Sequence, residues 1–593
     1  MAHSRTGPQR AVDTCTRRLQ GIDGLADGGP ADLAVTWHGP ARFDPGRPGS
    51  EASVQALCGI MEVNGRDEGT PRRLGLEVAS VAAGLLAAQG GLAAAVAGLR
   101  GQPVPVVHTS VLQAGLLLLS HYFVVATGLG DAVPGPPLPD PGPPFRSADG
   151  HWFEIEMLDA ELWKDFWTRL GVAADPDLGR AWTLFRWRYE RAACTMPPGL
   201  HQAASRRSLA ELRRVAAEAE VSLTPLRGYA DVLAEPGLGA LAGYPTVRSQ
   251  VGEERDEDPG ATPRLAGDGQ QLPLAGIRVV EATSRIQGPF AGMLLRMLGA
   301  DVVRVQPPEG DYGRAALCLH RGKEAVRLNL ATPAGRAELA ELIGGADVFL
   351  HNWRPGKAAQ WGLEFDDLAL RHPGLVYANT SGWGDRPLSS HLVGTDFLVQ
   401  AWAGMGDGLN PEGEPAFPSR VILCDLFGAL VGAEGILNGL YRRERTGYAS
   451  EVRSSLLAGA MALQAHVLDD IAQGKEEGRR QGRPLWGILD RPVATADGMV
   501  AMSVDDDEGF RRLCRLCHLD PAGASRAATE AQLATRLLDG TAAEWEQLLL
   551  DAGVPSAVVC ESLATVPADP RLAHLFEPVG IGGLAPRSPW SFA

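Results

Sequence analysis

The sequence predicts an α/β fold: a Rossmann-like large domain with a smaller α/β domain, in a module that occurs twice. Two observations support this prediction. Short apolar segments rich in β-branched residues alternate with helix-like segments between residues 272 and 380, which is typical of a parallel sheet. Segments of the first half also recur, in the same order, in the second half. At 593 residues the chain is too long for a single core, so several domains are expected.

The second half begins with a βαβ pattern. Residues 277–281 are expected to form a strand, the Gln-Gly-Pro of residues 287–289 a turn, residues 290–298 a helix and residues 301–305 the next strand. Residues 346–350 and 375–378 are expected to form later strands. The chain carries no GxGxxG sequence in this unit, so a dinucleotide fingerprint is not predicted.

The internal repeat is carried by three matches. Residues 49–59 resemble residues 394–404 with an offset of 345, measured between Gln55 and Gln400. The Asp-Gly pair at 149–150 and the segment 209–221 match Asp-Gly at 497–498 and the segment 542–554. Three matches in one order at similar spacing predict a tandem duplication.

The two copies are expected to be unequal, because the first has only a short polar segment before residue 49. A Pro-rich connector is expected at residues 134–144. The predicted boundaries are a flexible N-terminus at 1–30, a degenerate truncated copy at 31–250, an acidic Gly/Pro linker at 251–271 and a complete copy at 272–593.

Charge and cysteine content argue against several classes of protein. With 55 basic and 71 acidic residues the net charge is −16, which disfavours binding to nucleic acids or to anionic membranes. Eight widely spaced cysteines indicate reduced thiols, and no signal peptide is visible, so a cytoplasmic location is expected. Residues 111–128 are the most apolar candidate for a membrane span and are interpreted as a buried helix.

The motifs of the second half resemble those of the class III CoA-transferases, a family that also contains acyl-CoA racemases. The matching segments run in family order: 274–280 (LAGIRVV), 287–289 (QGP), 298–305 (LGADVVRV), 310–311 (GD), 321–330 (RGKEAVRLNL), 346–356 (ADVFLHNWRPG), 394–396 (GTD), 424–425 (CD) with Gly428, and 441–447 (YRRERTG). The first half resembles the later part of the same module.

The resemblance implies a mechanism and an assembly. In this family a carboxylate of the large domain attacks an acyl-CoA thioester, giving an acyl anhydride and then an enzyme-bound CoA thioester, and two chains interlock. By position the nucleophile is Asp425, and CoA enters as a thioester substrate with no tightly bound cofactor. Asp425 stands at the start of a helix expected over residues 426–443, where free N–H groups favour an ionised aspartate. Spacing alone favours a simple N-cap, and it is the family resemblance that favours a catalytic role.

Two further positions near the nucleophile carry chemistry. Racemases of this family have a histidine base where this chain has Thr395, and threonine cannot act as that base near neutral pH, so racemisation is disfavoured. The neighbouring Asp396 is expected either to touch the reaction centre or to make a structural hydrogen bond.

The resemblance also indicates positions that contact CoA. Lys323 and Arg354 could supply positive charge for phosphates, with surface solvation as the alternative. Gln360 and Gln306 depart from the basic and acidic residues usual in relatives, which predicts weak CoA binding. The full set of expected CoA contacts is Gln287, Lys323, Leu328, Asn329, Thr332, Asn352, Trp353 and Arg354.

The first copy is expected to lack the nucleophile. The offset of 345 places Ser80 at the position of Asp425, and with a gap Glu77 would be a substitute carboxylate. No base for Ser80 is apparent nearby, so a degenerate structural partner is the favoured interpretation. Residues 514–518 spell a CxxCH haem motif, but they lie in an expected amphipathic helix, and neither haem nor a metal site is predicted.

Three functions are compatible with these features. The favoured one is an acyl-CoA:carboxylate CoA-transferase that acts through Asp425 on small-molecule acyl-CoA and carboxylate substrates. The alternatives are a repurposed enzyme of secondary metabolism that catalyses hydrolysis, elimination, isomerisation or cyclisation, and a non-catalytic scaffold. The two copies are expected to pair within one chain as a pseudo-dimer, with a further homodimer left open.

Overall fold

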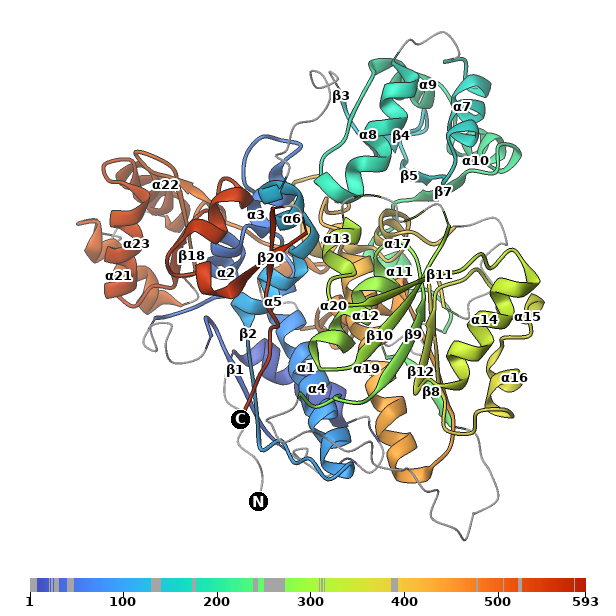
Figure 1. Cartoon of the computed structure of the whole chain (residues 1–593). Coiled ribbons are helices and arrows are strands. Elements are labelled where there is room, and N and C mark those ends of the chain that lie inside the picture. The colour runs from blue at the N-terminus through green and yellow to red at the C-terminus, as the bar shows by residue number, and fades with distance from the viewer. Residues whose placement is uncertain are drawn as a thin grey trace.

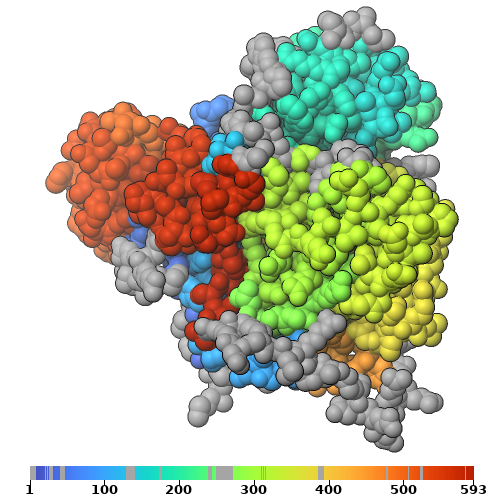
Figure 2. Space-filling view, viewed as in Figure 1, coloured from blue at the N-terminus to red at the C-terminus, as the bar shows by residue number. Residues whose placement is uncertain are grey.

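The computed structural model describes most of the chain, and the molecule has three lobes (Figure 2). The residues outside the description are 1–7, 21, 23–24, 26–30, 40–46, 129–139, 173–176, 238–243, 250–271, 309, 311–312, 314, 385–392, 476–477, 505, 521–524 and 581. The predicted linker at 251–271 and most of the Pro-rich connector therefore lie outside the described residues.

The largest lobe is built on a seven-stranded sheet with the order β11-β10-β9-β12-β13-β14-β8 (Figure 1). All neighbouring strands are parallel except the last pair, β14 and β8. The strands are β9 (Arg278–Ala282), β10 (Asp301–Gln306), β11 (Glu324–Arg327), β12 (Val348–His351), β13 (Val376–Ser381), β14 (Ser450–Ser455) and β8 (Thr246–Ser249). The predicted βαβ start of a parallel sheet is confirmed, but residues 287–289, expected to form a turn, are the first residues of helix α12 (Gln287–Met297).

Helices cover both faces of this sheet because alternate strand residues are buried on opposite sides. Val279 belongs to the apolar cluster under α12 and α19, whereas Val280 belongs to the cluster under α14 and α16. The helices of this lobe are α12 (Gln287–Met297), α13 (Ala315–Leu319), α14 (Pro333–Gly344), α15 (Lys357–Gln360), α16 (Phe365–Ala369), α17 (Asp396–Trp402), α18 (Met405–Leu409), α19 (Leu423–Thr446) and α20 (Leu456–Ala472).

The first half adds a smaller sheet, with the order β1-β2-β22, and a group of helices packed on it. The elements are α1 (Gln9–Gln20), β1 (Asp32–Thr36), α2 (Glu51–Cys58), α3 (Ile60–Gly65), α4 (Val78–Leu99), β2 (Val106–Ser110), α5 (Val111–Leu118), α6 (Ser120–Gly128) and β22 (Ser591–Phe592). The apolar segment 111–128 is thus two buried helices.

Helix α1 differs from the prediction, which placed residues 9–20 in a flexible N-terminus. The helix forms because Ala11, Cys15 and Leu19 recur every four residues and are buried in the main core. Arg18 on the same helix makes a buried ion pair with Glu434 of α19, at 2.7 Å. The N-terminal segment is therefore part of the core.

Two outer domains form the other lobes, one from each half (Figure 1). The first contains β3 (Asp140–Pro141), β4 (Phe145–Arg146), β5 (Trp152–Glu156), α7 (Ala160–Arg169), α8 (Leu178–Arg191), β6 (Thr195–Met196), α9 (Pro198–Ser205), α10 (Leu209–Glu218) and β7 (Ser222–Pro225), followed by α11 (Tyr229–Leu233). The second contains β17 (Val493–Ala494), β18 (Met499–Met502), α21 (Asp507–Leu516), α22 (Arg526–Leu537), α23 (Ala542–Asp551) and β19 (Ser556–Val558), flanked by β15 (Arg479–Arg480), β16 (Arg483–Pro484), β20 (Phe576–Val579) and β21 (Gly583–Pro586).

Each half contributes a strand to the sheet of the other half. Strand β8, from the end of the first half, pairs antiparallel with β14, and β22, from the end of the second half, pairs antiparallel with β2. In the first pairing Arg453 lies opposite Thr246, and in the second His108 lies opposite Ser591. Arg453 and His108 are 345 residues apart, and so are Ser591 and Thr246. The two halves therefore exchange equivalent strands.

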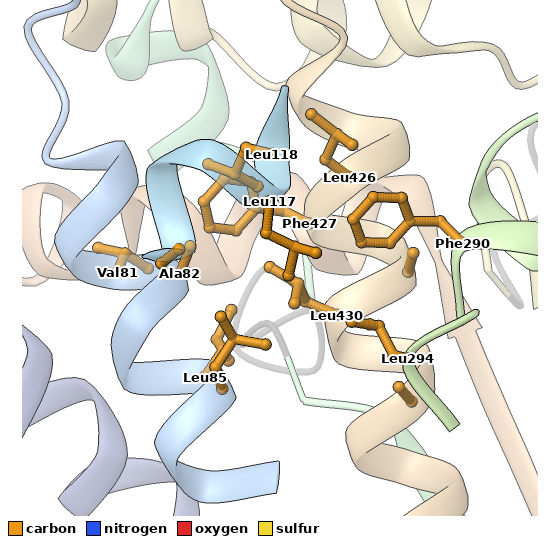
Figure 3. Packing of buried hydrophobic residues seen from close by; sticks show 14 of the residues in the cluster. Val81, Ala82, Leu85, Leu117, Leu118, Phe290, Leu294, Leu426, Phe427 and Leu430 are labelled. Carbon is orange, nitrogen blue, oxygen red and sulfur yellow. The ribbon is translucent and has the colours of Figure 1, made fainter. Parts of the chain in front are cut away.

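Helices α4 and α19 pack together at the centre of the molecule (Figure 3). Val81, Ala82 and Leu85 of α4 are buried there, together with Leu426, Phe427 and Leu430 of α19, and each residue has its 345-offset counterpart in the other set. An interface that buries the same positions of two helices is what a two-fold symmetric contact produces. Both helices are long and apolar enough to cross a membrane, and 94% of the apolar window of each is buried inside the protein.

Backbone hydrogen bonds repeat with the same offset. The N–H of Leu112 donates to the carbonyl of Trp37, and the N–H of Leu457 donates to the carbonyl of Gly382, at 2.9 and 3.2 Å. In the outer domains a related bond recurs at other offsets: the side chain of Asp149 accepts the N–H of Leu209, and the side chain of Asp497 accepts the N–H of Ala542. The sequence matches therefore coincide with matching local structure.

Candidate active site

Asp425 lies in the first turn of α19. The residue that precedes the helix is Ile422, so Asp425 is the third helical residue and not the N-cap. The helix ends at Gly447, whose positive φ of 74° suits glycine. Asp425 is half-buried, unlike its fully buried neighbours in the first turn of the helix.

Asp396 supports the start of α19 from outside the helix. Its Oδ2 atom accepts the N–H of Asp425 at 2.8 Å, and the N–H of Cys424 points to the same carboxylate. Its Oδ1 atom accepts the side-chain amide of Gln400 at 2.6 Å. Asp396 is fully buried, so of its two predicted roles the structural hydrogen bond is the one that these contacts support.

The electrostatics of Asp425 differ from the expectation based on the helix N-terminus. Burial and then the neighbouring Asp396 carboxylate raise the pKa of Asp425 well above its usual value, against the lowering effects of Arg285 and of the Gln287 N–H. Loss of water around the carboxylate thus outweighs the partial positive charge of the helix. Burial also raises the pKa of Asp396, against the hydrogen bonds that it accepts.

Gln287 lies directly beside this carboxylate. It is the first residue of α12, its backbone N–H points to Asp425, and its side chain is only 5% exposed. Its Nε2 atom has no hydrogen-bond partner within the described part of the chain, although it is buried. A Cβ atom at Gly428 would lie 2.8 Å from that nitrogen, so glycine at this position leaves room for the amide.

The outer domain of the first half contributes one wall of the site. Glu156 of β5 accepts the hydroxyl of Thr395 at 3.3 Å and also accepts the hydroxyl of Tyr189 from α8. The Tyr189 ring packs on Phe397 of α17, with 5.1 Å between ring centroids. Thr395 is therefore bound to the other half of the chain.

A buried arginine holds this wall together. Arg188 donates to Glu154 at 3.0 Å and to Glu156 at 3.1 Å, and its guanidinium lies 4.3 Å from the centre of the Phe397 ring. The sequence analysis missed Glu154, Glu156, Arg188 and Tyr189. The sequence did carry a signal for them: two acidic residues lie in an apolar strand, and an arginine lies in an aromatic-rich helix. Buried charges are usually paired, so these residues could have been expected to form an ion pair.

The predicted CoA contacts are distributed between structural and exposed positions. The side chain of Lys323 is fully buried, and its ammonium group is bound to Glu281 at 2.7 Å and to the Pro289 carbonyl at 2.8 Å. Burial lowers the pKa of Lys323, against the effect of Glu281. Its charge is thus used inside the protein, and a phosphate could reach it only if this ion pair opened.

Asn352 and Trp353 follow β12 at the carboxyl end of the sheet. Asn352 Oδ1 accepts the N–H of Ser284 at 3.0 Å, and its Nδ2 donates to the Ser284 carbonyl at 2.8 Å. Asn352 therefore fixes the loop that leads to Gln287. Trp353 is half-buried and packs against His351 and Trp361.

The remaining predicted contacts lie between β11 and α14. Leu328 is buried and lines a surface cavity of about 280 Å³. Asn329 accepts the N–H of Ala331, and Thr332 is the N-cap of α14. These polar side chains make local turns and a cap, which any helix start requires.

Arg354 and Gln360 lie in and beside the short helix α15. Arg354 is exposed, so its guanidinium is accessible to a ligand. Gln360 accepts a hydrogen bond from Lys357 at 3.0 Å, and the Lys357 ammonium lies 4.6 Å from the centre of the Trp361 ring. A cation therefore lies next to Gln360, although residue 360 itself is neutral.

The start of α4 in the first half has the same hydrogen-bond arrangement as the start of α19. Glu51 accepts the N–H groups of Ala79 and Ser80, both at 2.9 Å, and also the side-chain amide of Gln55 at 3.0 Å. The Ser80 hydroxyl donates to the same carboxylate at 2.6 Å. Ser80 thus occupies the place of Asp425, as the gapless offset predicts.

Glu77, the alternative carboxylate of the first half, is held in an ion pair. It bonds to Arg10 at 2.6 Å and lies 3.7 Å from His466. Cys514 is buried in α21 and Cys517 follows that helix, also buried, and within the described residues no group of three or more histidine, cysteine or acidic side chains could hold a metal ion.

These features define the class of protein: a mixed α/β enzyme with a carboxylate nucleophile candidate at a helix start. The family model "CoA-transferase family III" matches residues 34–270 and 274–575. The chain belongs to this family of enzymes, as the sequence motifs predicted.

Comparisons with two CoA-transferases of known name agree with this assignment. The chain is 28% identical over 329 residues to succinyl-CoA:glutarate CoA-transferase of Mus musculus, covering 51% of this chain and 75% of that protein. It is 30% identical over 310 residues to acetyl-CoA:oxalate CoA-transferase of Acetobacter aceti, covering 48% and 79%. Among solved structures, Rv3272 of Mycobacterium tuberculosis is 31% identical, with a TM-score of 0.45 over 54% of this chain and 92% of that one.

Proposed function

We propose that this chain is an acyl-CoA:carboxylate CoA-transferase in which Asp425 is the nucleophile. The observation that carries the proposal is the position of Asp425: its backbone is anchored by Asp396, and its half-buried carboxylate meets the N–H of Gln287, whose buried side-chain amide has no partner among the described residues. Distant relatives, about 30% identical, are named as CoA-transferases for dicarboxylic acids and for fatty acyl groups.

The proposed reaction consists of balanced exchanges at one carboxylate. Asp425 attacks the thioester carbonyl carbon, the C–S bond breaks, and CoA leaves as a thiolate while an acyl-aspartyl anhydride remains. The thiolate then attacks the aspartyl carbonyl of the anhydride, which releases the donor acid and leaves CoA bound to Asp425. An acceptor carboxylate repeats these two steps in reverse order, which regenerates the free carboxylate.

Gln287 has the geometry to assist each exchange. Every attack on a carbonyl carbon develops negative charge on oxygen, and a fixed N–H donor stabilises that charge. The Gln287 Nε2 atom is such a donor, because it is buried, unpaired within the described residues and next to Gly428. Binding of the reacting oxygen would satisfy this buried polar group.

We also propose that the two halves are copies of one module that pair as a pseudo-dimer within the chain. Support comes from the reciprocal pairing of β8 and β22 and from the α4–α19 contact through offset-related residues. It also comes from Glu156 and Tyr189, which bring the outer domain of the first half to Thr395. In this proposal one chain builds one complete active site.

The proposal is tested by incubating the purified chain with acetyl-CoA and with succinyl-CoA, followed by peptide mass spectrometry. The expected result is an acyl or CoA adduct on the peptide that contains Asp425, and its absence from an Asp425→Asn variant. An adduct on another residue, or turnover without any adduct at Asp425, would favour one of the repurposed reactions. No adduct and no turnover with either donor would favour the scaffold.

A further inference from the structure

The loop before α12 carries an arginine at the edge of the Asp425 site. Arg285 is exposed, and two residues further on the N–H of Gln287 points to the Asp425 carboxylate. Between them Ile286 is buried and precedes the helix. The guanidinium is therefore attached to the same short segment that contacts the nucleophile.

The backbone of Arg285 is held in an unusual conformation. Its φ angle is +67°, in the left-handed region that side chains other than glycine rarely adopt. The preceding residue is fixed on both sides, because Asn352 accepts from the Ser284 N–H and donates to the Ser284 carbonyl. Glycine would fit this conformation without strain, so an arginine here indicates a use for the side chain.

The charges around Asp425 leave a role for that side chain. Asp396 and Glu156 are both acidic, and the buried Arg188 is shared between Glu154 and Glu156. Arg285 is a cation whose charge lowers the pKa of Asp425, and it makes no hydrogen bond or ion pair with the residues that the structure describes. Among these described groups, Asp396 and Glu156 repel a second carboxylate that approaches Asp425, and Arg285 attracts it.

We propose that Arg285 binds the carboxylate of the acceptor acid; this inference rests on the proposed transferase function. The acceptor must bring a negatively charged carboxylate to the CoA thioester of Asp425. One of its oxygens attacks the aspartyl carbonyl carbon, the C–S bond breaks, the thiolate leaves, and a new anhydride joins Asp425 to the acceptor. A guanidinium can hold the other oxygen and offset the repulsion, because its planar fork matches a carboxylate.

The experiment separates the two half-reactions in four variants. Arg285→Gln removes the charge, Arg285→Lys keeps it, Arg285→Gly removes both the charge and the backbone strain, and Arg214→Gln removes an exposed charge of the first outer domain, 65% exposed. Loading of Asp425 by acetyl-CoA or succinyl-CoA is measured without acceptor by mass spectrometry. Turnover is then measured against increasing oxalate or glutarate.

The expected result is normal loading in all variants and a selective defect in the use of the acceptor. KM for the acceptor should rise at least about 10-fold in Arg285→Gln and Arg285→Gly and less than about 3-fold in Arg285→Lys, with no change in Arg214→Gln. Arg285→Gly should also melt at the same or a higher temperature than wild type, which shows that the defect is not unfolding.

Two results would overturn the inference. If Arg285→Gln left KM for the acceptor unchanged, or slowed loading as much as turnover, Arg285 would not be the acceptor site. If the wild-type chain itself showed no adduct at Asp425, the proposed function would fail and this inference with it. Normal loading with an unchanged acceptor KM would instead reject Arg285 alone and leave the proposed function standing.

Discussion

The starts of helices α19 and α4 are built on the same hydrogen bonds but carry different chemistry. In α19 a buried carboxylate, Asp396, accepts the N–H of Asp425, and in α4 a buried carboxylate, Glu51, accepts the N–H of Ser80. Gln400 and Gln55 bind these carboxylates in the same way and donate to two backbone carbonyls each. The supporting frame is thus retained where the nucleophile candidate is not.

This comparison separates support from catalysis. The N–H groups of a helix start need acceptors wherever they are buried, so the carboxylate and the glutamine are required for folding in both places. The carboxylate of Asp425 also accepts a helix N–H, that of Gln287, but burial and Asp396 raise its pKa and make its ionised form costly. A costly charge that is present at one site only is the residue to which we assign the chemistry.

The largest effect is expected from removing one side of the comparison altogether. A chain that lacks residues 1–250 loses β8 from the edge of β14 and exposes Leu426, Phe427 and Leu430 of α19. We expect an insoluble or inactive product, because a bare strand edge and a large apolar patch promote aggregation. Soluble yield and size-exclusion chromatography are the measurements, with deletion of residues 1–7 as the control. A soluble, fully active dimer of residues 272–593 would contradict the pseudo-dimer.

The next largest effect is expected at the nucleophile. Asp425→Asn should lower turnover by at least about 1,000-fold, since an amide cannot form the anhydride. Ser80→Ala, the matched change in the first half, should leave turnover within about 2-fold of wild type, because Ser80 has no assigned role in catalysis. Steady-state kinetics on both variants is the measurement. Equal losses of turnover in the two variants would mean that both helix starts take part in catalysis.

The supporting carboxylates should behave alike in stability and differently in activity. Asp396→Asn and Glu51→Gln each place an amide where two backbone N–H groups need an acceptor, at a cost of about 1–3 kcal/mol. Chemical denaturation should show similar destabilisation. Only Asp396→Asn should also lower kcat, by about 10–100-fold, because it moves Asp425. A loss of kcat in Glu51→Gln of the same size would show that the first site takes part in turnover.

A smaller effect concerns pH and stability. The pKa of Asp425 is raised by folding, so between the ordinary value and the raised value the folded state binds more protons than the unfolded state. Stability contributed by this residue therefore falls as pH increases through that window. Compared with wild type, Asp425→Asn should have a higher melting temperature at pH 8 and a nearly equal one at pH 4, measured by calorimetry. A difference of the same size at both pH values would place the pKa of Asp425 at its ordinary value.

The smallest effect is expected at the exposed CoA contacts. Arg354→Ala and Lys357→Ala should each raise KM for the acyl-CoA donor by about 2–5-fold, since exposed cations contribute little individually to phosphate binding. Lys323→Met should instead lower stability, because it leaves Glu281 buried without its cation. If calorimetry showed tight CoA binding that did not depend on Arg354, this residue would not be a CoA contact.

Sequence reasoning found the features that depend on local pattern. The βαβ start, the helix after Asp425 and the correspondence of Ser80 with Asp425 all follow from periodicity and from an ungapped offset, which are visible along the chain. Helix α1 was missed because its apolar side is only three residues wide and its amphipathic pattern is short. The sequence predicted that the helix start would favour an ionised Asp425, whereas burial raises its pKa. This was missed because burial depends on the whole fold.

Contacts between distant segments could not be predicted. Glu156 and Thr395 are 239 residues apart, and no local signal pairs them. The sequence around Lys323 is typical of a polar surface loop. Only the packing of α12 over β9 brings Lys323 to its partner Glu281. Arg285 is inconspicuous in the sequence, because its left-handed φ angle is set by the contacts of its neighbours.

The claim that one chain holds one active site, with its nucleophile at Asp425, is tested most directly by counting adducts. The intact chain is incubated with saturating acetyl-CoA or succinyl-CoA without acceptor, trapped in acid, and weighed by intact-protein mass spectrometry. The account predicts one acyl or CoA adduct per chain, located on Asp425. Two adducts per chain, or one located in the first half near Ser80, would contradict it.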